Sequence, residues 1–215
     1  MKLDAGRIFA GLVGQSESNL RAVIQTAEAI APCCLWIDEV EKRFSGTKSS
    51  NATDGGTSAR VFGSFLSWMQ EKSAPVFVVA TANDVSQLPP EMLRKGRLDE
   101  LFFVDLPNQA EREAIGDIQI GKHGRDPRDY DLVQLAKTTE GLTGSEIENV
   151  FIEALYLAFD LGKEPTDLDI ARVLTEFVPL SKLMAEQIGS LRNWAKGRAR
   201  LATSPGVERG LRKIL

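Results

Sequence analysis

Two adjacent carboxylates, Asp38 and Glu39, directly follow a short apolar run at residues 34–37. In open α/β sheets, ligands bind beyond the carboxyl ends of the strands, so acids at this point are placed to act on a bound molecule. An aspartate there can hold Mg²⁺, directly or through water, and the next glutamate can accept a proton from a water that attacks a phosphoryl group. The pair by itself is also compatible with a helix start, because the helix dipole favours acids at its N-terminus.

Polar residues farther along the chain are spaced to complete a phosphate-handling site. Asn83 follows a second apolar run at residues 76–80, where a neutral amide can orient a water without competing for a metal. An asparagine there also suits an Asx turn. Arg94 and Arg97 stand three positions apart near a chain reversal. They are either ordinary surface arginines or arginine fingers that reach a phosphate on a neighbouring subunit.

The hydrophobic pattern predicts the elements that position these residues. Helical spacing of apolar residues predicts helices over residues 16–31 and 61–69. Apolar runs predict strands over residues 33–37, 76–80 and 101–104. This alternation of helices and strands predicts an α/β fold with a parallel sheet.

Burial on both faces is expected for the strand at residues 76–80, because uniformly apolar strands are typical of parallel sheets covered by helices. Cys33, Cys34 and Trp36 are expected to pack in the core. Glu41, by contrast, is expected on the first turn of a short solvent-facing helix.

Only helical patterns follow Pro107, and they form a candidate second subdomain. They cover residues 110–121, 132–138, 145–161, 166–177 and 181–199.

Composition limits the class of protein. With 215 residues, 43% of them hydrophobic and 26% charged, the chain is long enough for one good core, or for one domain with a smaller appendage. The net charge of −4 implies no overall attraction to nucleic acid or membranes, and no apolar run approaches the ~18 residues of a membrane span. The adjacent Cys33 and Cys34 and the single His123 argue against a disulfide framework and a histidine-rich metal site, and favour a reducing, cytoplasmic location.

The order, spacing and types of these residues resemble the AAA+ ATPases over most of the chain. The segments that carry the resemblance are "LWIDEVEK", "PVFVVATAND", "LRKGRLD" and "GLTGSEIENVFIEA". The resemblance implies that Asp38 and Glu39 form a Walker B pair, as metal ligand and base, and that Asn83 is the sensor 1 residue. It also implies that Arg94 and Arg97 are arginine fingers. On the lid helix, it implies near-nucleotide positions at Gly144 and Ser145.

Within that family, the chain looks like the uncharacterised AAA proteins of cyanobacteria and algal plastids, on segments such as "APCCLWIDEVEK" and "VPLSKLMAEQIGSLRNWAKGRARLA". The resemblance implies ATP and Mg²⁺ as cofactors, with hydrolysis coupled to the remodelling of an unknown protein substrate. It implies a ring of identical or different AAA+ subunits, in the cytoplasm or, for a plastid-encoded gene, in the stroma. The expected fold is an incomplete parallel AAA+ sheet flanked by helices (residues 1–107), an all-helical lid (108–178), and a C-terminal helix with a basic tail (179–215).

An ATPase of this kind needs the loop G-x-x-x-x-G-K-[ST], whose backbone N–H groups cradle the phosphates. The near-match at residues 116–123 ends in His123 instead of a hydroxyl, lies in a helical pattern and follows the acid pair, so we reject it. We interpret the chain as a truncated or split AAA+ ATPase without the first strand, and expect residues 1–215 to bind ATP poorly alone. Loss of that strand would leave unpaired edges, or bring the strands at 76–80 and 101–104 together.

Two non-enzymatic hypotheses stand beside the ATPase. In the first, the chain is a non-catalytic AAA-like module that donates Arg94 and Arg97 to a complete neighbouring subunit. In the second, it is a helical adaptor whose C-terminal half and basic tail carry the partner contacts. From Lys182 onward eight Lys and Arg stand against two Glu, a local charge of +6, which suits either a solvated helix and tail or a docking surface for an acidic partner. Leu12 stands where threading AAA proteins usually carry a substrate-gripping aromatic, which favours remodelling of a specific partner over processive threading.

Overall fold

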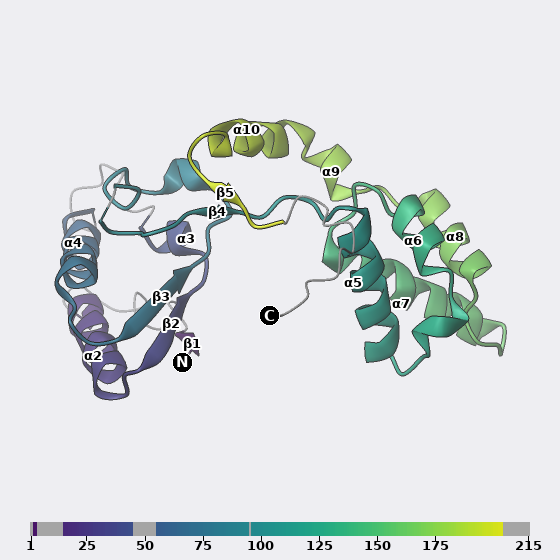
Figure 1. Cartoon of the computed structure of the whole chain (residues 1–215), viewed down its shortest axis with the longest axis horizontal. Helices are drawn as coiled ribbons and strands as arrows, with labels where there is room; N and C mark the ends of the chain where they lie inside the picture. The colour runs from purple at the N-terminus through teal and green to yellow at the C-terminus, as the bar shows by residue number, and fades with distance from the viewer. Residues whose placement is uncertain (1, 4–14, 45–54, 95, 204–215) are drawn as a thin grey trace, which may run out of the picture. The chain divides into compact units, whose positions relative to one another are not determined.

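The chain divides into two compact units, Met1–Glu100 and Leu101–Leu215. The structure is a computed structural model that describes residues 2–3, 15–44, 55–94 and 96–203 (Figure 1). Leu12, the residue at the expected pore-loop position, lies outside these ranges.

The first unit is a parallel sheet with helices on one face. Its strands lie in the order β1-β2-β3, and β2 pairs with β3 in a register that sets Cys33 opposite Val76 and Ile37 opposite Ala80. The expected strands at residues 33–37 and 76–80 and their parallel arrangement are therefore confirmed. The elements are β1 (Lys2–Leu3), α2 (Gln15–Ala29), β2 (Cys33–Ile37), α3 (Val40–Phe44), α4 (Gly55–Glu71), β3 (Val76–Ala80) and η2 (Val85–Gln87).

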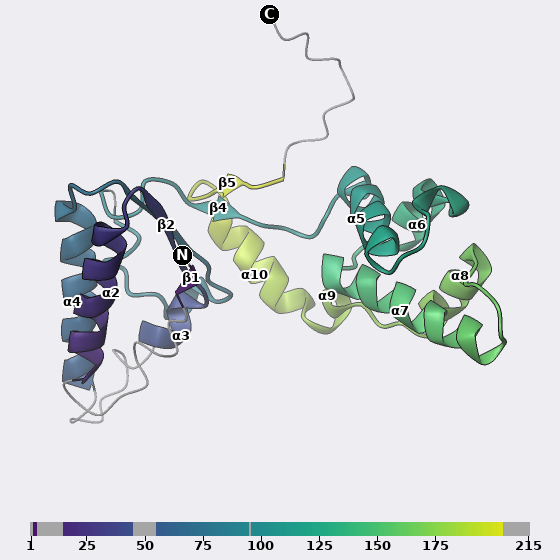
Figure 2. The ribbon, with the colours of Figure 1, turned by 90° about the horizontal axis from the view of Figure 1, so that it is seen from below.

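Among the described residues, a packed core lies on one face of this sheet. Leu35 and Val76 are 1% and 2% exposed and belong to a cluster with apolar residues of α2 and α4. Both helices lie on the same side of the strands in two views (Figures 1 and 2). Because side chains alternate along a strand, the residues next to Leu35 in β2 and next to Val76 in β3 point to the other face.

That other face is open, which corrects two expectations. Cys34 is exposed, and Trp36 and Phe77 are 42% and 70% exposed. The strand at residues 76–80 is therefore not buried on both faces, and Cys34 and Trp36 do not lie in the core. The physical reason is that, within the described ranges, α2 and α4 cover just one side of the sheet.

The expected strand at residues 101–104 is present but lies in the second unit. It forms β4 (Phe102–Phe103), which pairs in parallel with β5 (Arg200–Leu201) and not with β3. Strand β3 is an outer strand of the described sheet. β5 is an element that the helical pattern at residues 181–199 did not predict.

The rest of the second unit is helical, as its sequence pattern predicts. Buried apolar side chains of α5, α6, α7 and α8, including Ile120, Leu135, Val150 and Ile170, form one core. Capping boxes start α5, at Asn108 with Glu111, and α7, at Thr143 with Glu146, among others. The helices are α5 (Gln109–Lys122), α6 (Leu132–Thr138), α7 (Gly144–Asp160), α8 (Asp167–Glu176), α9 (Leu180–Leu183) and α10 (Ala185–Ala195), with η3 (Pro127–Asp129) before α6.

The single helix expected over residues 181–199 is instead two helices, α9 and α10 (Figure 2). The chain leaves helical geometry at Met184, where φ is −114° and ψ is 29°. Two arginines of the basic segment that begins at Lys182 bind groups within the second unit. Arg192 forms an ion pair with Asp105 at 2.8 Å, and Arg198 donates a hydrogen bond to the Trp194 carbonyl at 2.9 Å.

The rejected near-match to a phosphate-binding loop lies within α5, and this confirms the reason for rejecting it. A Cβ at Gly116 would come within 2.8 Å of Leu135 Cδ2. This glycine therefore allows α5 to pack closely against α6, and its presence has a structural explanation.

An ion pair between the buried Asp169 and the exposed Lys163 connects the start of α8 to the preceding loop. Asp169 is 8% exposed, and both of its carboxylate oxygens lie 2.8 Å from Lys163 Nζ. The Thr166 backbone N–H and hydroxyl also donate to it, at 2.9 and 2.7 Å. Chiefly the Lys163 hydrogen bond, and then those from Thr166, lower the pKa of Asp169 from 3.8 to about 2.

We expect Asp169→Asn to destabilise the protein at neutral pH. The difference in stability between variant and wild type should become smaller as the pH is lowered into the acid range. Because the pKa is lower in the folded state, the charged carboxylate stabilises the fold fully above pH 3.8, and this contribution is lost as the pH falls toward about 2. Thermal melts followed by circular dichroism across this range provide the measurement. Asp117→Asn, at an exposed carboxylate on α5, is the matched control. A difference between variant and wild type that stays constant with pH would contradict the assignment.

Candidate functional site

The candidate acid pair and Asn83 come together at one edge of the sheet. Asp38 and Glu39 follow β2, Asn83 follows β3, and the in-register pairing of these parallel strands places their carboxyl ends side by side. Asn83 Nδ2 lies 3.4 Å from Glu39 Oε1. Two side chains separated by 44 positions in the sequence are therefore hydrogen-bonded neighbours.

Thr81, which sequence reasoning missed, holds the turn that carries the acids. Its hydroxyl donates to Asp38 Oδ1 and accepts the Glu39 backbone N–H at 3.1 Å. Glu39 has a φ of 50°, in the left-handed region that non-glycine residues rarely adopt. Such backbone strain is concentrated at functional sites, where surrounding contacts maintain it.

Glu41 corrects the expectation of a solvent-facing helix. It is 2% exposed, and its Oε1 accepts the Asn83 backbone N–H at 3.1 Å. Its Oε2 is buried and has no hydrogen-bond partner in the described structure. Sequence reasoning missed this residue because glutamate at a helix start is usually exposed, and no local signal marks an acid that a loop 42 positions away will cover.

The charge of Glu39 is balanced within its own turn. Lys42 Nζ lies 2.5 Å from Glu39 Oε1, and both side chains are partly exposed, at 59% and 36%. An ion pair this exposed stabilises the fold little, by about 0–1 kcal/mol. The ion pair instead helps to orient the Glu39 side chain, because Lys42 and Asn83 both contact the same carboxylate oxygen.

The surroundings of Asp38 fit Mg²⁺, which needs few protein ligands, better than a metal ion that is coordinated by protein side chains alone. It is exposed, and its contact with Thr81 engages one carboxylate oxygen and leaves the other open. Within the described ranges, no three or more His, Cys, Asp and Glu side chains gather into a metal-binding group. Mg²⁺ is commonly bound by one or two carboxylates, with substrate phosphates and waters completing its shell, so Asp38 fits as a single protein ligand.

The two candidate arginines of the first unit differ in their surroundings. Arg97 is half-buried and donates from Nη1 to the Glu91 carbonyl at 3.0 Å. Arg94 is exposed, and its guanidinium makes no hydrogen bond or ion pair within the part of the chain that the structure describes. Neither arginine contacts Asp38 or Glu39 in that part. Arg94 is therefore available to another molecule, whereas Arg97 also shapes its own loop.

Gly144 and Ser145 begin α7 in the second unit. Thr143 caps this helix together with Glu146, and Ser145 is exposed. A Cβ at Gly144 would lie 3.6 Å from Ile115 Cδ1, an ordinary contact distance. Packing within the unit therefore does not require glycine here, which is compatible with a close approach of a ligand to this backbone.

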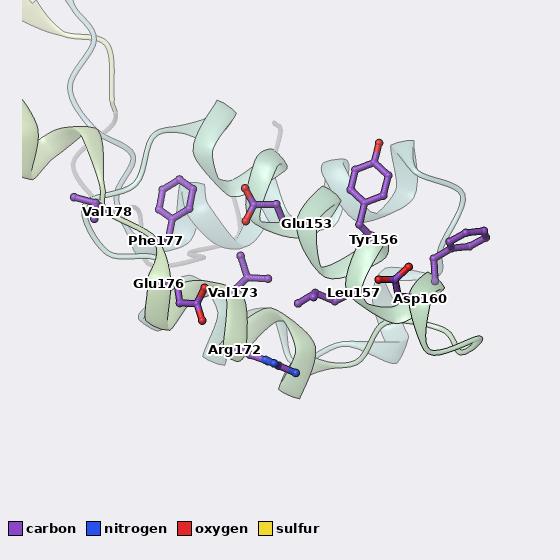
Figure 3. A pocket seen from close by; sticks show the side chains of 10 residues that line it. Glu153, Tyr156, Leu157, Asp160, Arg172, Val173, Glu176, Phe177 and Val178 are labelled. Carbon is purple, nitrogen blue, oxygen red and sulfur yellow. The ribbon is translucent and has the colours of Figure 1, made fainter.

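A surface cavity of about 740 Å³ lies between α7 and α8 (Figure 3). Its lining combines apolar side chains such as Leu157, Val173 and Phe177 with the charged Glu153 and Arg172. Neither Gly144 nor Ser145 lines it. The cavity therefore has no part in the candidate site.

Comparisons with known proteins identify two matching family profiles. The sequence profile of the family described as "ATPase family associated with various cellular activities (AAA)" matches residues 1–106, and that of the AAA+ lid domain matches residues 129–168. In the described residues, no helix is long and apolar enough to cross a membrane.

The chain is also similar to curated proteins called "Uncharacterized AAA domain-containing protein ycf46". It is 50% identical over 205 residues to that of Pyropia yezoensis, 46% over 205 to that of Guillardia theta, and 48% over 209 to that of Trieres chinensis. These matches cover 94%, 94% and 96% of this chain, and 41%, 40% and 42% of the respective relatives. The chain thus spans about two fifths of the length of these relatives.

Proposed function

This chain belongs to the AAA family of ATPases, and we propose that it carries part of a Mg²⁺-dependent ATP hydrolase that remodels a protein partner. The observation that carries the proposal is the contact between Glu39 and Asn83 at the ends of neighbouring parallel strands. The attack of water on a phosphoryl group requires a base, a group that orients the water and a metal ligand. The neighbouring side chains of Glu39, Asn83 and Asp38 are of these three types.

Each group has one role in this proposal. Asp38 is the ligand for Mg²⁺, which neutralises the charge on the transferred phosphoryl group when it is bound with ATP. Glu39 accepts the proton of the attacking water at its carboxylate, and Asn83 orients that water. Arg94 and Arg97 stabilise the developing charge on the nucleotide of an adjacent subunit, and the backbone at Gly144 and Ser145 contacts the nucleotide.

The proposal extends to the assembly. Trans-acting arginines require neighbouring AAA+ subunits, identical to this chain or different. An exposed Arg94, whose guanidinium makes no hydrogen bond or ion pair within the described ranges, supports this arrangement. The protein substrate is unknown, and nucleic acid and membranes are not expected partners at a net charge of −4. The cytoplasm, or the stroma for a plastid gene, is the proposed location.

The direct test is ATPase activity of the native assembly. By native assembly we mean the protein isolated from its host through a C-terminal tag, together with every polypeptide that carries or accompanies this chain. Phosphate release that requires Mg²⁺ and is abolished by EDTA would support the proposal. A homogeneous native assembly with no Mg²⁺-dependent phosphate release would overturn it.

Residues 1–215 by themselves are expected to bind ATP weakly, because they contain no G-x-x-x-x-G-K-[ST] segment to hold the phosphates. Thermal melts of this polypeptide with and without millimolar ATP and Mg²⁺ should therefore coincide. Since a ligand that binds the native state raises the melting temperature, an increase of several degrees would contradict the expectation.

A non-catalytic module is the second candidate function, and the exposure of Arg94 favours it as much as it favours the hydrolase. In that case residues 1–215 supply arginines to a complete AAA+ subunit, and their own acid pair performs no chemistry. The two candidates differ in the expected effect of Glu39→Gln, which lowers turnover only in a hydrolase.

A further inference from the structure

Thr81 makes hydrogen bonds to four successive residues of the turn after β2. Its backbone N–H donates to the Ile37 carbonyl at 2.9 Å, and its own carbonyl accepts the Val40 N–H at 2.9 Å. Between these two, its hydroxyl donates to Asp38 Oδ1 and accepts the Glu39 N–H at 3.1 Å. One residue at the end of β3 thus contacts every residue of the turn that carries both candidate acids.

The hydroxyl adds what no backbone group at this position supplies. The two backbone bonds continue the strand pairing and are available to any residue except proline. A hydroxyl has one donor and two acceptor sites, so it can donate to the Asp38 carboxylate while it accepts from the Glu39 amide. Valine has the same shape as threonine and lacks both capacities, and serine retains both.

The conformation of Glu39 depends on these bonds. Its φ of 50° is unfavourable for a residue with a Cβ, so the turn needs contacts that favour it over the ordinary extended or helical geometry. The Thr81 hydroxyl binds the amide on one side of Glu39, and the Thr81 carbonyl binds the Val40 amide on the other. In this conformation the Glu39 carboxylate reaches Asn83 Nδ2.

We propose that Thr81 is a positioning residue that sets both acids of the site. Its hydroxyl donates to one oxygen of Asp38 and leaves the other open, where it could hold a metal, and it holds Glu39 in the left-handed conformation in which the carboxylate reaches Asn83. This inference rests on the proposed ATP hydrolysis for its catalytic meaning, whereas the hydrogen bonds that carry it can be tested without nucleotide.

The test compares Thr81→Val and Thr81→Ser in two measurements. In the native assembly, Thr81→Val should lower kcat for ATP by about 10²-fold, the typical effect of a catalytic group displaced by about 1 Å, with little change in KM. Thr81→Ser should restore most of this loss. Thr26→Val, which removes an exposed hydroxyl bonded to the Ala22 carbonyl on α2, is the matched control and should leave kcat unchanged.

Amide hydrogen exchange of residues 1–215, followed by NMR, is the second measurement. The Glu39 N–H should lose protection in Thr81→Val and keep it in Thr81→Ser, while the Val40 N–H, which binds the Thr81 carbonyl, stays protected in both. Persistence of the Val40 protection also shows that the valine variant has kept its fold.

The outcomes separate this inference from the proposed function. Unchanged Glu39 protection in Thr81→Val, or lost protection with unchanged kcat, would overturn the positioning role. A kcat that falls equally in Thr81→Ser and Thr81→Val would overturn the role of the hydroxyl. Failure of the proposed function itself has a different signature, because turnover is then absent from the wild type as well as from the variants.

Discussion

Glu39→Gln should lower ATP turnover by the native assembly by about 10²- to 10⁴-fold, the range for loss of a general acid or base. Glutamine keeps the volume of the side chain and can still accept the hydrogen bond from Asn83, but it cannot take the proton of the attacking water. Asp38 is unchanged, so binding of ATP and Mg²⁺ should be retained. The measurements are steady-state phosphate release and binding of a fluorescent ATP analogue.

Glu71→Gln is the matched control, because Glu71 is an exposed residue at the end of α4. It should turn over ATP at the wild-type rate. Wild-type turnover in Glu39→Gln would remove Glu39 from the catalytic role and, if the assembly still hydrolyses ATP, would favour the module over the hydrolase. Loss of both turnover and nucleotide binding would indicate a structural role for this residue instead.

Arg94→Ala should lower turnover by about 10³-fold or more, the effect of removing an arginine finger. The Arg94 side chain is exposed, and its guanidinium makes no hydrogen bond or ion pair within the described residues, so the melting temperature should change little. Arg21→Ala is the matched control, since Arg21 is 70% exposed on α2 and its single ion pair, with Glu17, is a surface pair.

Mixing Arg94→Ala subunits with Glu39→Gln subunits tests whether the arginine acts in trans. A Glu39→Gln subunit can donate its intact Arg94 to a neighbour that has an intact Glu39, so two inactive variants should regain part of the turnover. No such complementation is possible if both residues act on the nucleotide of their own subunit. Arg97→Ala is less informative, because Arg97 also holds the Glu91 carbonyl and its loss would disturb the loop.

Short-range patterns predicted the main helices and strands of this chain, but not β5 or the break between α9 and α10. The apolar runs at β2 and β3 gave strands with the expected bounds, because five uniformly apolar residues between polar turns have few other ways to be buried. The helical patterns after Pro107 likewise predicted α5, α6, α7 and α8. The order of the acid pair, Asn83 and the two arginines was also readable, because order and spacing are properties of the sequence.

The exposure of β3 could not be predicted from its residues. In a uniformly apolar strand, the alternation that distinguishes a covered face from an open one is absent, so Phe77 and Val76 look alike although one is 70% and the other 2% exposed. Which face is covered depends on where helices from other parts of the chain pack.

The interior of the candidate site also depended on the tertiary fold. Thr81 and Glu41 carry no motif of their own, and each acts on a partner more than 40 positions away. Residue types and local spacing therefore specified which groups could perform chemistry. Their contacts arose only when two parallel strands placed their carboxyl ends together, because hydrogen bonds between distant residues depend on strand register and not on sequence pattern.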